Sequence, residues 1–231
     1  MSGARNTRIF ELNASTLRDL NSTLQNEAPD AAWDIQNPAG RHSLAVGLTQ
    51  PISVTIDGHA GYYAGGMNQR ANIVINGNAG QGVAENMMSG SVHVKGNASS
   101  SAGATAHGGL LVIDGDAGAR CGISMKGVDI VVRGSVGHMS AFMGQSGNLV
   151  VCGDTGEALG DSLYETRIFV RGTVKGLGAD CEEKEMTPED LDILASLLTK
   201  SGITDVTAGE FRRYGSARKL YHFRVDNASA Y

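Results

Sequence analysis

Apolar and polar positions alternate at regular places through the middle of the chain. Two apolar columns, separated by one residue, recur every 19 residues and contain only Val, Ile and Leu. Alternation with a period of two is typical of a strand with one buried face, and β-branched residues favour strands. The pattern therefore predicts seven short strands, with the apolar pairs Val54 and Ile56, Ile73 and Ile75, Val92 and Val94, Leu111 and Ile113, Ile130 and Val132, Leu149 and Val151, and Ile168 and Val170.

A glycine stands two residues after each apolar pair and keeps the same period. Glycine accounts for 32 of the 231 residues, so seven glycines in one register indicate a structural repeat rather than composition. Further columns of small residues follow three and seven positions later. Such columns suit a backbone conformation that a Cβ disfavours, or a close approach of two segments. The structural glycines of the first column are Gly58, Gly77, Gly96, Gly115, Gly134, Gly153 and Gly172.

A unit of 19 residues cannot enclose a core alone, but stacked copies can share one. Strands of successive coils would then pair in parallel at roughly 4.8 Å. The chain lacks the signatures of leucine-rich and calcium-binding nonapeptide repeats, and left-handed hexapeptide coils would require about 18 residues. The sequence predicts an all-β chain, a right-handed parallel β-helix of about seven coils with short α/β terminal caps.

Segments outside the repeats divide the chain into an N-terminal cap at 1–47, β-helix repeats at 48–180, and a C-terminal helix and tail at 181–231. The first part contains an apolar strand around Ile9 to Leu12 and a short helix from Thr16 to Gln25. Both ends of a β-helix expose unpaired strand edges, so segments that cover these edges are expected.

The C-terminal part begins with a well-marked helix. Thr187 suits the N-cap, Pro188 suits the first helical position and Gly202 suits the stop. Residues from Glu210 to Val225 are expected to form an irregular strand tail. The apolar face of the helix should contain Leu191, Leu194, Ala195 and Leu198.

The charge and the hydropathy of the chain argue against two classes of partner, nucleic acid and membranes. The net charge is -5, and the scattered Lys and Arg residues form no basic stripe for nucleic acid. No apolar run approaches the roughly 18 residues of a membrane span, and Met1 to Leu20 contains no apolar signal-peptide core. We therefore expect a cytoplasmic protein that binds neither nucleic acid nor membranes.

Residues that carry chemistry are scattered. Cys121, Cys152 and Cys181 stand 31 and 29 residues apart without a Cys-x-x-Cys pair, which argues against zinc or an iron–sulfur cluster. The six histidines fall at different places in the repeat, and no nucleophile elbow is present. We expect no catalytic, cofactor-binding or metal-binding residue in this chain.

Two polar columns are expected to be structural. Lys95, Asp114 and Arg133 share one column and predict a surface ladder of ion pairs. The other column, whose residue types suit turns with left-handed backbone, contains Asn78, Asn97, Asp116 and Asp154.

The tandem Gly-x-x-Gly-x-x-x-Gly unit, in coils such as Val54 to Gly61 and Leu111 to Gly118, resembles the C-terminal β-helix domain of the glutamate synthase large subunit. The resemblance covers roughly Gly40 to Ala179. It implies a structural block that lies beside a glutaminase-type amidotransferase domain and a flavin-binding synthase domain, and that carries no catalytic residue itself.

As a free-standing β-helix with its own caps, the chain is most similar to the β-helix subunit of the N-methylglutamate synthases. The segments Ile35 to His42 and Gly61 to Met67 carry this resemblance. It implies a hetero-oligomer with a class II amidotransferase-like subunit and an FMN-binding subunit, and no cofactor in this chain. The implied reaction converts methylamine and L-glutamate to N-methyl-L-glutamate and ammonia.

Two alternatives remain. The β-helix subunit of formylmethanofuran dehydrogenase and of formyltransferase/hydrolase complexes shares the repeats and a tail like Arg213 to Gly215. A self-contained carbohydrate-binding or carbohydrate-cleaving β-helix would need aromatic platforms or acidic clusters, which this chain lacks.

If the β-helix is a docking block, large apolar residues at its turns are candidate contacts. Methionine-rich surface is common at interfaces because the side chain is flexible. The candidates are Met67, Met87, Met88, Met125, Met139, Phe142 and Met143.

Overall fold

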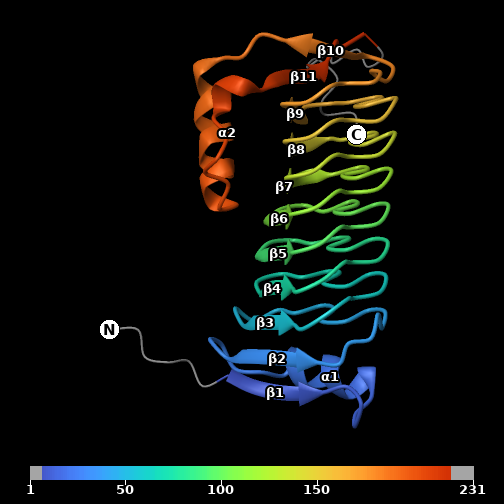
Figure 1. Ribbon diagram of the computed structural model, residues 1–231, viewed down its shortest axis with the longest axis vertical. Helices are drawn as coiled ribbons and strands as arrows, with labels where there is room; N and C mark the ends of the chain where they lie inside the picture. Colours follow the sequence, from blue (N-terminus) through green and yellow to red (C-terminus); the bar gives the residue numbers. More distant parts are fainter. Residues whose placement is uncertain (1–6, 220–231) are drawn as a thin grey trace, which may run out of the picture.

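The computed structural model describes residues 7–219 as one tall stack of coils (Figure 1). Its single sheet has 11 strands in the order β1-β2-β3-β4-β5-β6-β7-β8-β9-β11-β10, and all neighbours from β1 to β9 are parallel. The strands are β1 Thr7–Glu11, β2 Ala32–Gln36, β3 Ser53–Ile56, β4 Asn72–Ile75, β5 Ser91–Val94, β6 Leu110–Ile113, β7 Lys126–Val132, β8 Ser146–Val151, β9 Arg167–Val170, β10 Cys181–Lys184 and β11 Arg212–Ser216.

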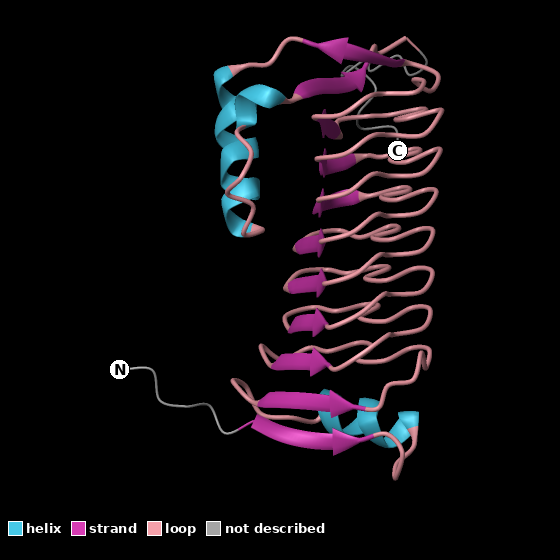
Figure 2. Cartoon of the chain, viewed as in Figure 1, coloured by secondary structure: helices cyan, strands magenta, loops and turns pink. Residues whose placement is uncertain are grey.

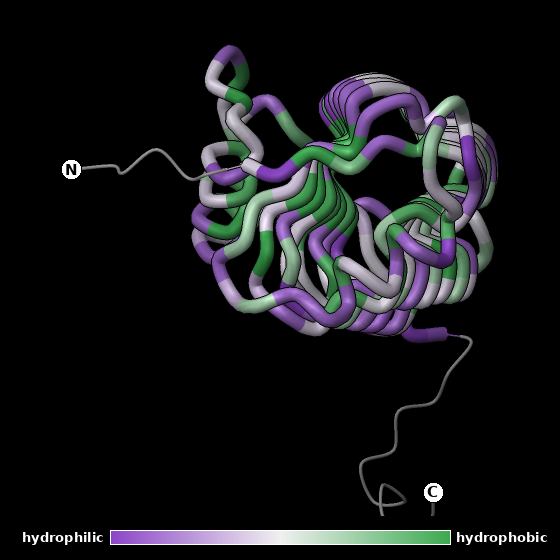
Figure 3. The backbone as a smooth tube through the Cα atoms, turned by 90° about the horizontal axis from the view of Figure 1, so that it is seen from below, coloured by the Kyte–Doolittle hydropathy of each residue, from purple (hydrophilic) through white to green (hydrophobic). Residues whose placement is uncertain are grey.

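The register of the sheet follows the sequence repeat. Val54 pairs with Ile73, and Ile73 with Val92, so each parallel step from β3 to β9 advances the chain by 19 residues. The two apolar columns point inward and are buried in every coil. Viewed along the stack, residues of similar hydropathy lie over one another in successive coils (Figure 3). The predicted parallel β-helix of about seven coils is confirmed.

Close chain approach explains the first glycine column. The amide of Gly96 donates to the carbonyl of Gly77 at 3.0 Å, and the amide of Gly115 donates to Gly96 at 3.0 Å. A Cβ on Gly77 would lie 2.7 Å from the carbonyl carbon of Gly58. Every glycine of this column from Gly77 onward has ordinary φ and lies against the coil below. Glycine is therefore required here because a Cβ would collide with that coil, and not because the backbone conformation excludes other residues.

Left-handed backbone belongs to other columns. The position seven residues after the repeat glycine has φ between 57° and 70° in the six coils that begin with Gly58 through Gly153, which explains its restriction to Gly and Ala. The positions five and nine residues after it are also left-handed, as at Tyr63 and Met67. Their amides alternate in direction, because Tyr63 donates to Gln81 in the coil above and Gly65 to Leu44 in the coil below. Each turn thereby bonds to both neighbouring coils.

The N-terminal cap extends the stack downward. The helix α1, Leu17–Gln25, begins after its N-cap Thr16 and buries Leu20 and Leu24 at the lower end of the core (Figure 1). β1 and β2 pair in parallel below β3, so the sheet continues without a break into the segment before residue 48.

The C-terminal segment closes the top and turns back along the stack. β11 pairs antiparallel with β9 and β10, and the helix α2, Pro188–Lys200, stands against the outer face of the sheet (Figure 2). The short 3-10 helix Ala208–Glu210 precedes β11. Thr187 caps α2 as predicted, and Gly202 follows its last turn with φ 71°. Of the predicted tail, residues 220–225 lie outside the described residues.

The predicted apolar face of α2 was partly wrong. Leu194 and Leu198 are buried as expected, but Leu191 and Ala195 are exposed and Leu197 is buried in their place. The reason is the surface against which the helix packs. Three outward apolar residues of the consecutive strands β7, β8 and β9 form a second core with α2, and they are Val131, Val150 and Phe169.

Neither described helix could cross a bilayer, since α1 has 9 residues and α2 has 13.

Candidate functional site

The column of Asn78, Asn97 and Asp116 is a hydrogen-bond ladder between coils. The amide of Asn97 donates to Oδ1 of Asn78 at 2.9 Å, and the amide of Asp116 donates to Oδ1 of Asn97 at 2.8 Å. The ladder runs from His59 to Thr173. The prediction of left-handed backbone here was wrong, since these residues have no positive φ. Their side chains are instead committed to joining the coils.

The charged column forms a ladder only in part. Asp114 lies 3.4 Å from Lys95 Nζ, and its other oxygen lies 2.8 Å from Nε2 of His93. Arg133 does not join them and pairs with Asp205 at 2.8 Å. The segment after α2 lies along the upper coils and supplies this carboxylate, so the ladder predicted through Arg133 is interrupted there.

The thiols of Cys121 and Cys152 are buried and that of Cys181 is partly buried, and none is placed as a nucleophile. Burial raises the pKa of Cys121 to about 12 and is the main cause that raises the pKa of Cys152 to about 11. Burial and then neighbouring carboxylates raise the pKa of Cys181 to about 12. A thiol with such a pKa is protonated at neutral pH and does not attack an electrophile. Within residues 7–219, no three His, Cys, Asp or Glu side chains are grouped to hold a metal ion.

Two of the seven candidate contact residues are in the core. Met87 and Met125 have no exposed surface, so their interpretation as interface residues was wrong. Both occupy the position ten residues after the repeat glycine, which points inward in each coil. Met67, Met88 and Met143 are 45%, 49% and 40% exposed, whereas Met139 and Phe142 are partly buried.

The structure gathers three of these residues on one surface. Met139, Phe142 and Met143 belong to one turn, and Ile123 lies below Phe142 in the preceding coil, where the amide of Ser124 donates to the Phe142 carbonyl at 2.8 Å. We call Ile123, Met139, Phe142 and Met143 the turn-side patch. The sequence signal for Ile123 was present, since Ile123 and Phe142 both stand eight residues after a repeat glycine.

The other exposed methionines are separate from this patch. Met67 occupies the same position in its coil as Met143, but four coils lower, and the polar residues Asn86, Thr105 and Ser124 lie between them. Met88 stands at a different position of the repeat. The turn-side patch is therefore a local apolar surface and not a stripe along the whole stack.

Comparison with known proteins finds one relative of similar length. No family model and no solved structure matches the chain. Protein GlxC of Rhizobium meliloti (strain 1021) is 58% identical over 226 residues, which cover 96% of this chain and 99% of that protein. The chain belongs to the GlxC family. Because the match spans nearly both full lengths, the kinship with GlxC includes the two caps and α2 as well as the repeated coils.

Proposed function

We propose that this chain is the structural β-helix subunit of a multi-subunit, glutamate-synthase-like enzyme, in which it holds an amidotransferase-like subunit and an FMN-binding subunit in register. The observation that carries the proposal is the sequence motif from which each coil is built. The Gly-x-x-Gly-x-x-x-Gly unit, through which the sequence resembles the β-helix domain of glutamate synthase, builds the whole stack.

The distribution of side chains supports a positioning role. The side chains of the polar ladder accept hydrogen bonds from backbone amides and the thiols are buried or partly buried, so these groups serve the fold. The coils are linked to each other by hydrogen bonds on every side. Such a stack provides a rigid surface, and the turn-side patch offers an apolar contact on it.

We assign the reaction of the complex as N-methylglutamate synthesis, in which methylamine and L-glutamate give N-methyl-L-glutamate and ammonia. FMN would be bound by the partner subunit, and the cytoplasm is the expected location. The resemblance of the coil and of the segment that enters it supports this assignment. Fixed geometry between separate subunits is required when an amine generated at one site must react at another.

Co-expression tests the proposal. The chain should co-purify with an amidotransferase-like subunit and an FMN-binding subunit in a stable complex whose contacts each bury more than about 1,000 Å². The flavin should remain with the partner when the complex is dissociated. Purification with a formyltransferase and its hydrolase instead would overturn the assignment in favour of the formyltransferase type of complex.

A further inference from the structure

Two adjoining depressions lie where β11 passes the starts of β8 and β9. Their volumes are about 240 Å³ and about 600 Å³, and they share Glu165, Arg213 and Arg218 as lining residues. The first is also lined by Lys184 and Thr166, and the second by Arg167. We call the combined depression the basic groove, and its charged lining residues are Glu165, Arg167, Lys184, Arg213 and Arg218.

The lining of the groove is mostly cationic in a chain that is acidic overall. Four cations and one carboxylate line it, and each cation also has a carboxylate partner, whereas the whole chain has a net charge of -5. A concave surface lined by one sign of charge concentrates the field and attracts ligands of the opposite sign. The lining therefore favours an anion.

The carboxylates behind the groove hold the cations in place. Arg167 donates to Glu189 at 2.9 Å, and Lys184 donates to Glu182. Neither Glu182 nor Glu189 lines the depression, so both carboxylates lie outside the space that a ligand would occupy. Their effect is to fix the two cations at the rim.

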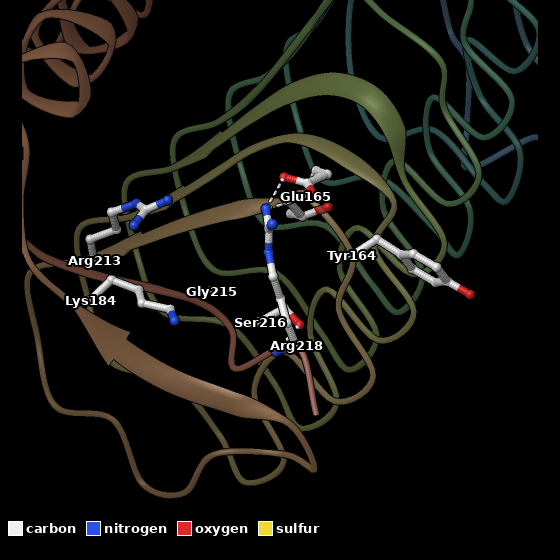
Figure 4. A pocket seen from close by; sticks show the side chains of 8 residues that line it. Tyr164, Glu165, Lys184, Arg213, Gly215, Ser216 and Arg218 are labelled. Carbon is white, nitrogen blue, oxygen red and sulfur yellow. Dashed lines mark hydrogen bonds and ion pairs between the residues drawn. The ribbon is translucent and has the colours of Figure 1, made fainter. Parts of the chain in front are cut away.

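Arg213 has the most suitable geometry for a ligand. Its Nε lies 3.2 Å from Oδ1 of the buried Asp190, without the alignment of a hydrogen bond. Within residues 7–219, no hydrogen bond or ion pair engages its two terminal nitrogens, and the side chains of Arg213 and Lys184 both extend toward Arg218 across the groove (Figure 4). A guanidinium anchored in this way presents a fork that matches two oxygens of a carboxylate or phosphate.

Thr166 belongs to the wall of the smaller depression but does not offer a ligand contact. The residue is 2% exposed, and its Oγ1, which has no hydrogen-bond partner within the described part of the chain, lies next to Gly144 of the coil below. The ligand contacts are therefore assigned to the cations alone.

Glu165 opposes the ligand at the far side. Nη2 of Arg218 donates to Oε1 and Oε2 of Glu165 at 2.9 and 3.1 Å, so the Glu165 carboxylate occupies the Arg218 guanidinium. This pair shows that a carboxylate can bind to a guanidinium of the groove. It also means that the ligand must contact Arg213 and Lys184 first.

We propose that the basic groove binds a small oxyanion, a carboxylate or phosphate group, with Arg213 and Lys184 as its main contacts and Glu165 as a competing internal carboxylate. The proposal does not rest on the function assigned to the complex. Inorganic phosphate and succinate serve as probes for the two sources of this chemistry.

The experiment is calorimetric titration of the full-length chain with each probe at low salt. At least one probe should bind saturably at one site, and Arg213→Gln and Lys184→Gln should each weaken binding at least tenfold. Glu165→Gln should strengthen binding several-fold, because it removes the competing charge and releases Arg218. Arg133→Gln is the matched control, since Arg133 is an exposed arginine paired with Asp205 outside the groove.

A thermal melt of every variant shows that it is folded, and Arg213→Lys provides a second variant that keeps the charge but loses the fork. Binding of phosphate alone identifies a phosphate ligand, and binding of succinate alone a carboxylate. The absence of saturable binding of both probes to the folded wild-type chain would overturn the proposal. Equal affinity of Arg213→Gln and Arg133→Gln would also overturn it.

Discussion

Nε of Arg213 lies 3.2 Å from Oδ1 of Asp190, a carboxylate that is only 2% exposed. The same oxygen lies 3.6 Å from Nε of Arg167, and Oδ2 accepts hydrogen bonds from the amide and the hydroxyl of Thr187 at 3.1 and 2.7 Å. One buried side chain therefore joins the start of α2 to both β9 and β11.

Removal of this carboxylate should loosen α2 from the sheet. Asp190→Ala removes the capping box and leaves two arginines without a buried partner, so we expect a loss of about 2–4 kcal/mol in the free energy of unfolding. Denaturant titration measures the loss, and hydrogen exchange should show faster exchange of β7 to β9. Glu189→Gln is the control, because the exposed pair of Glu189 with Arg167 should contribute less than about 1 kcal/mol. Equal losses in the two variants would contradict this role of Asp190.

The glycine column should be intolerant of a side chain. A Cβ on Gly115 would overlap Oδ1 of Asn97 and lie 2.9 Å from the carbonyl oxygen of Gly96. Because both neighbours belong to the rigid coil below, Gly115→Val should cost about 2 kcal/mol or more. Thermal unfolding is the measurement.

The adjacent position provides the control for this prediction. Asp116→Ser should cost little, because Ser135 already fills the equivalent place one coil higher and its Oγ accepts from the amide of Asp154 at 3.0 Å. Similar small shifts for Gly115→Val and Asp116→Ser would show that the column is not required for close approach.

The buried thiols predict an alkaline loss of stability. Burial raises the pKa of Cys121 from 9.0 to about 12, so the unfolded chain loses its thiol proton first as the pH rises. The stabilisation is present below about pH 9 and is lost between about pH 9 and about pH 12, at up to about 1.4 kcal/mol per pH unit. Denaturant titrations between pH 8.5 and 10.5 should give a shallower pH dependence for Cys121→Ala than for the wild-type chain. Identical slopes would contradict the assignment.

The turn-side patch should matter for partner binding and not for folding. Met143 is 40% exposed with φ 54°, and glutamate at this position carries the same backbone strain as methionine. Met143→Glu should therefore leave the melting temperature unchanged and weaken binding to a partner subunit at least tenfold. Met88→Glu, at an exposed methionine outside the patch, should change neither quantity. Unchanged binding of Met143→Glu would exclude the patch from the interface.

The strands and the stack could be predicted because their signals are local and repeated. The pair at Val54 and Ile56 recurs in every coil, and the Thr16 and Thr187 caps are visible in a few adjacent residues. The left-handed positions five and nine residues after the repeat glycine were not predicted, because Tyr63, Met67 and their equivalents show no preference for glycine. Hydrogen bonds to both neighbouring coils maintain those conformations.

The outer face and the basic groove depend on contacts between distant segments. The sequence does contain a hint of the helix site, since the outward column includes the polar residues Thr55 and His93 in lower coils but is apolar throughout from Val112 to Phe169. The groove has no comparable signal. It arises because β11 returns antiparallel beside β9 and brings Arg213 close to residues from other coils.

Reconstitution tests the central claim most directly. An amidotransferase-like subunit and an FMN-binding subunit of the proposed complex are assayed for methylamine-dependent formation of N-methylglutamate with and without this chain. We expect activity only when all three are present, and loss of activity when the chain is omitted although both partners are folded and the flavin is bound. Full activity of the two partner subunits alone would contradict the claim that this β-helix positions them.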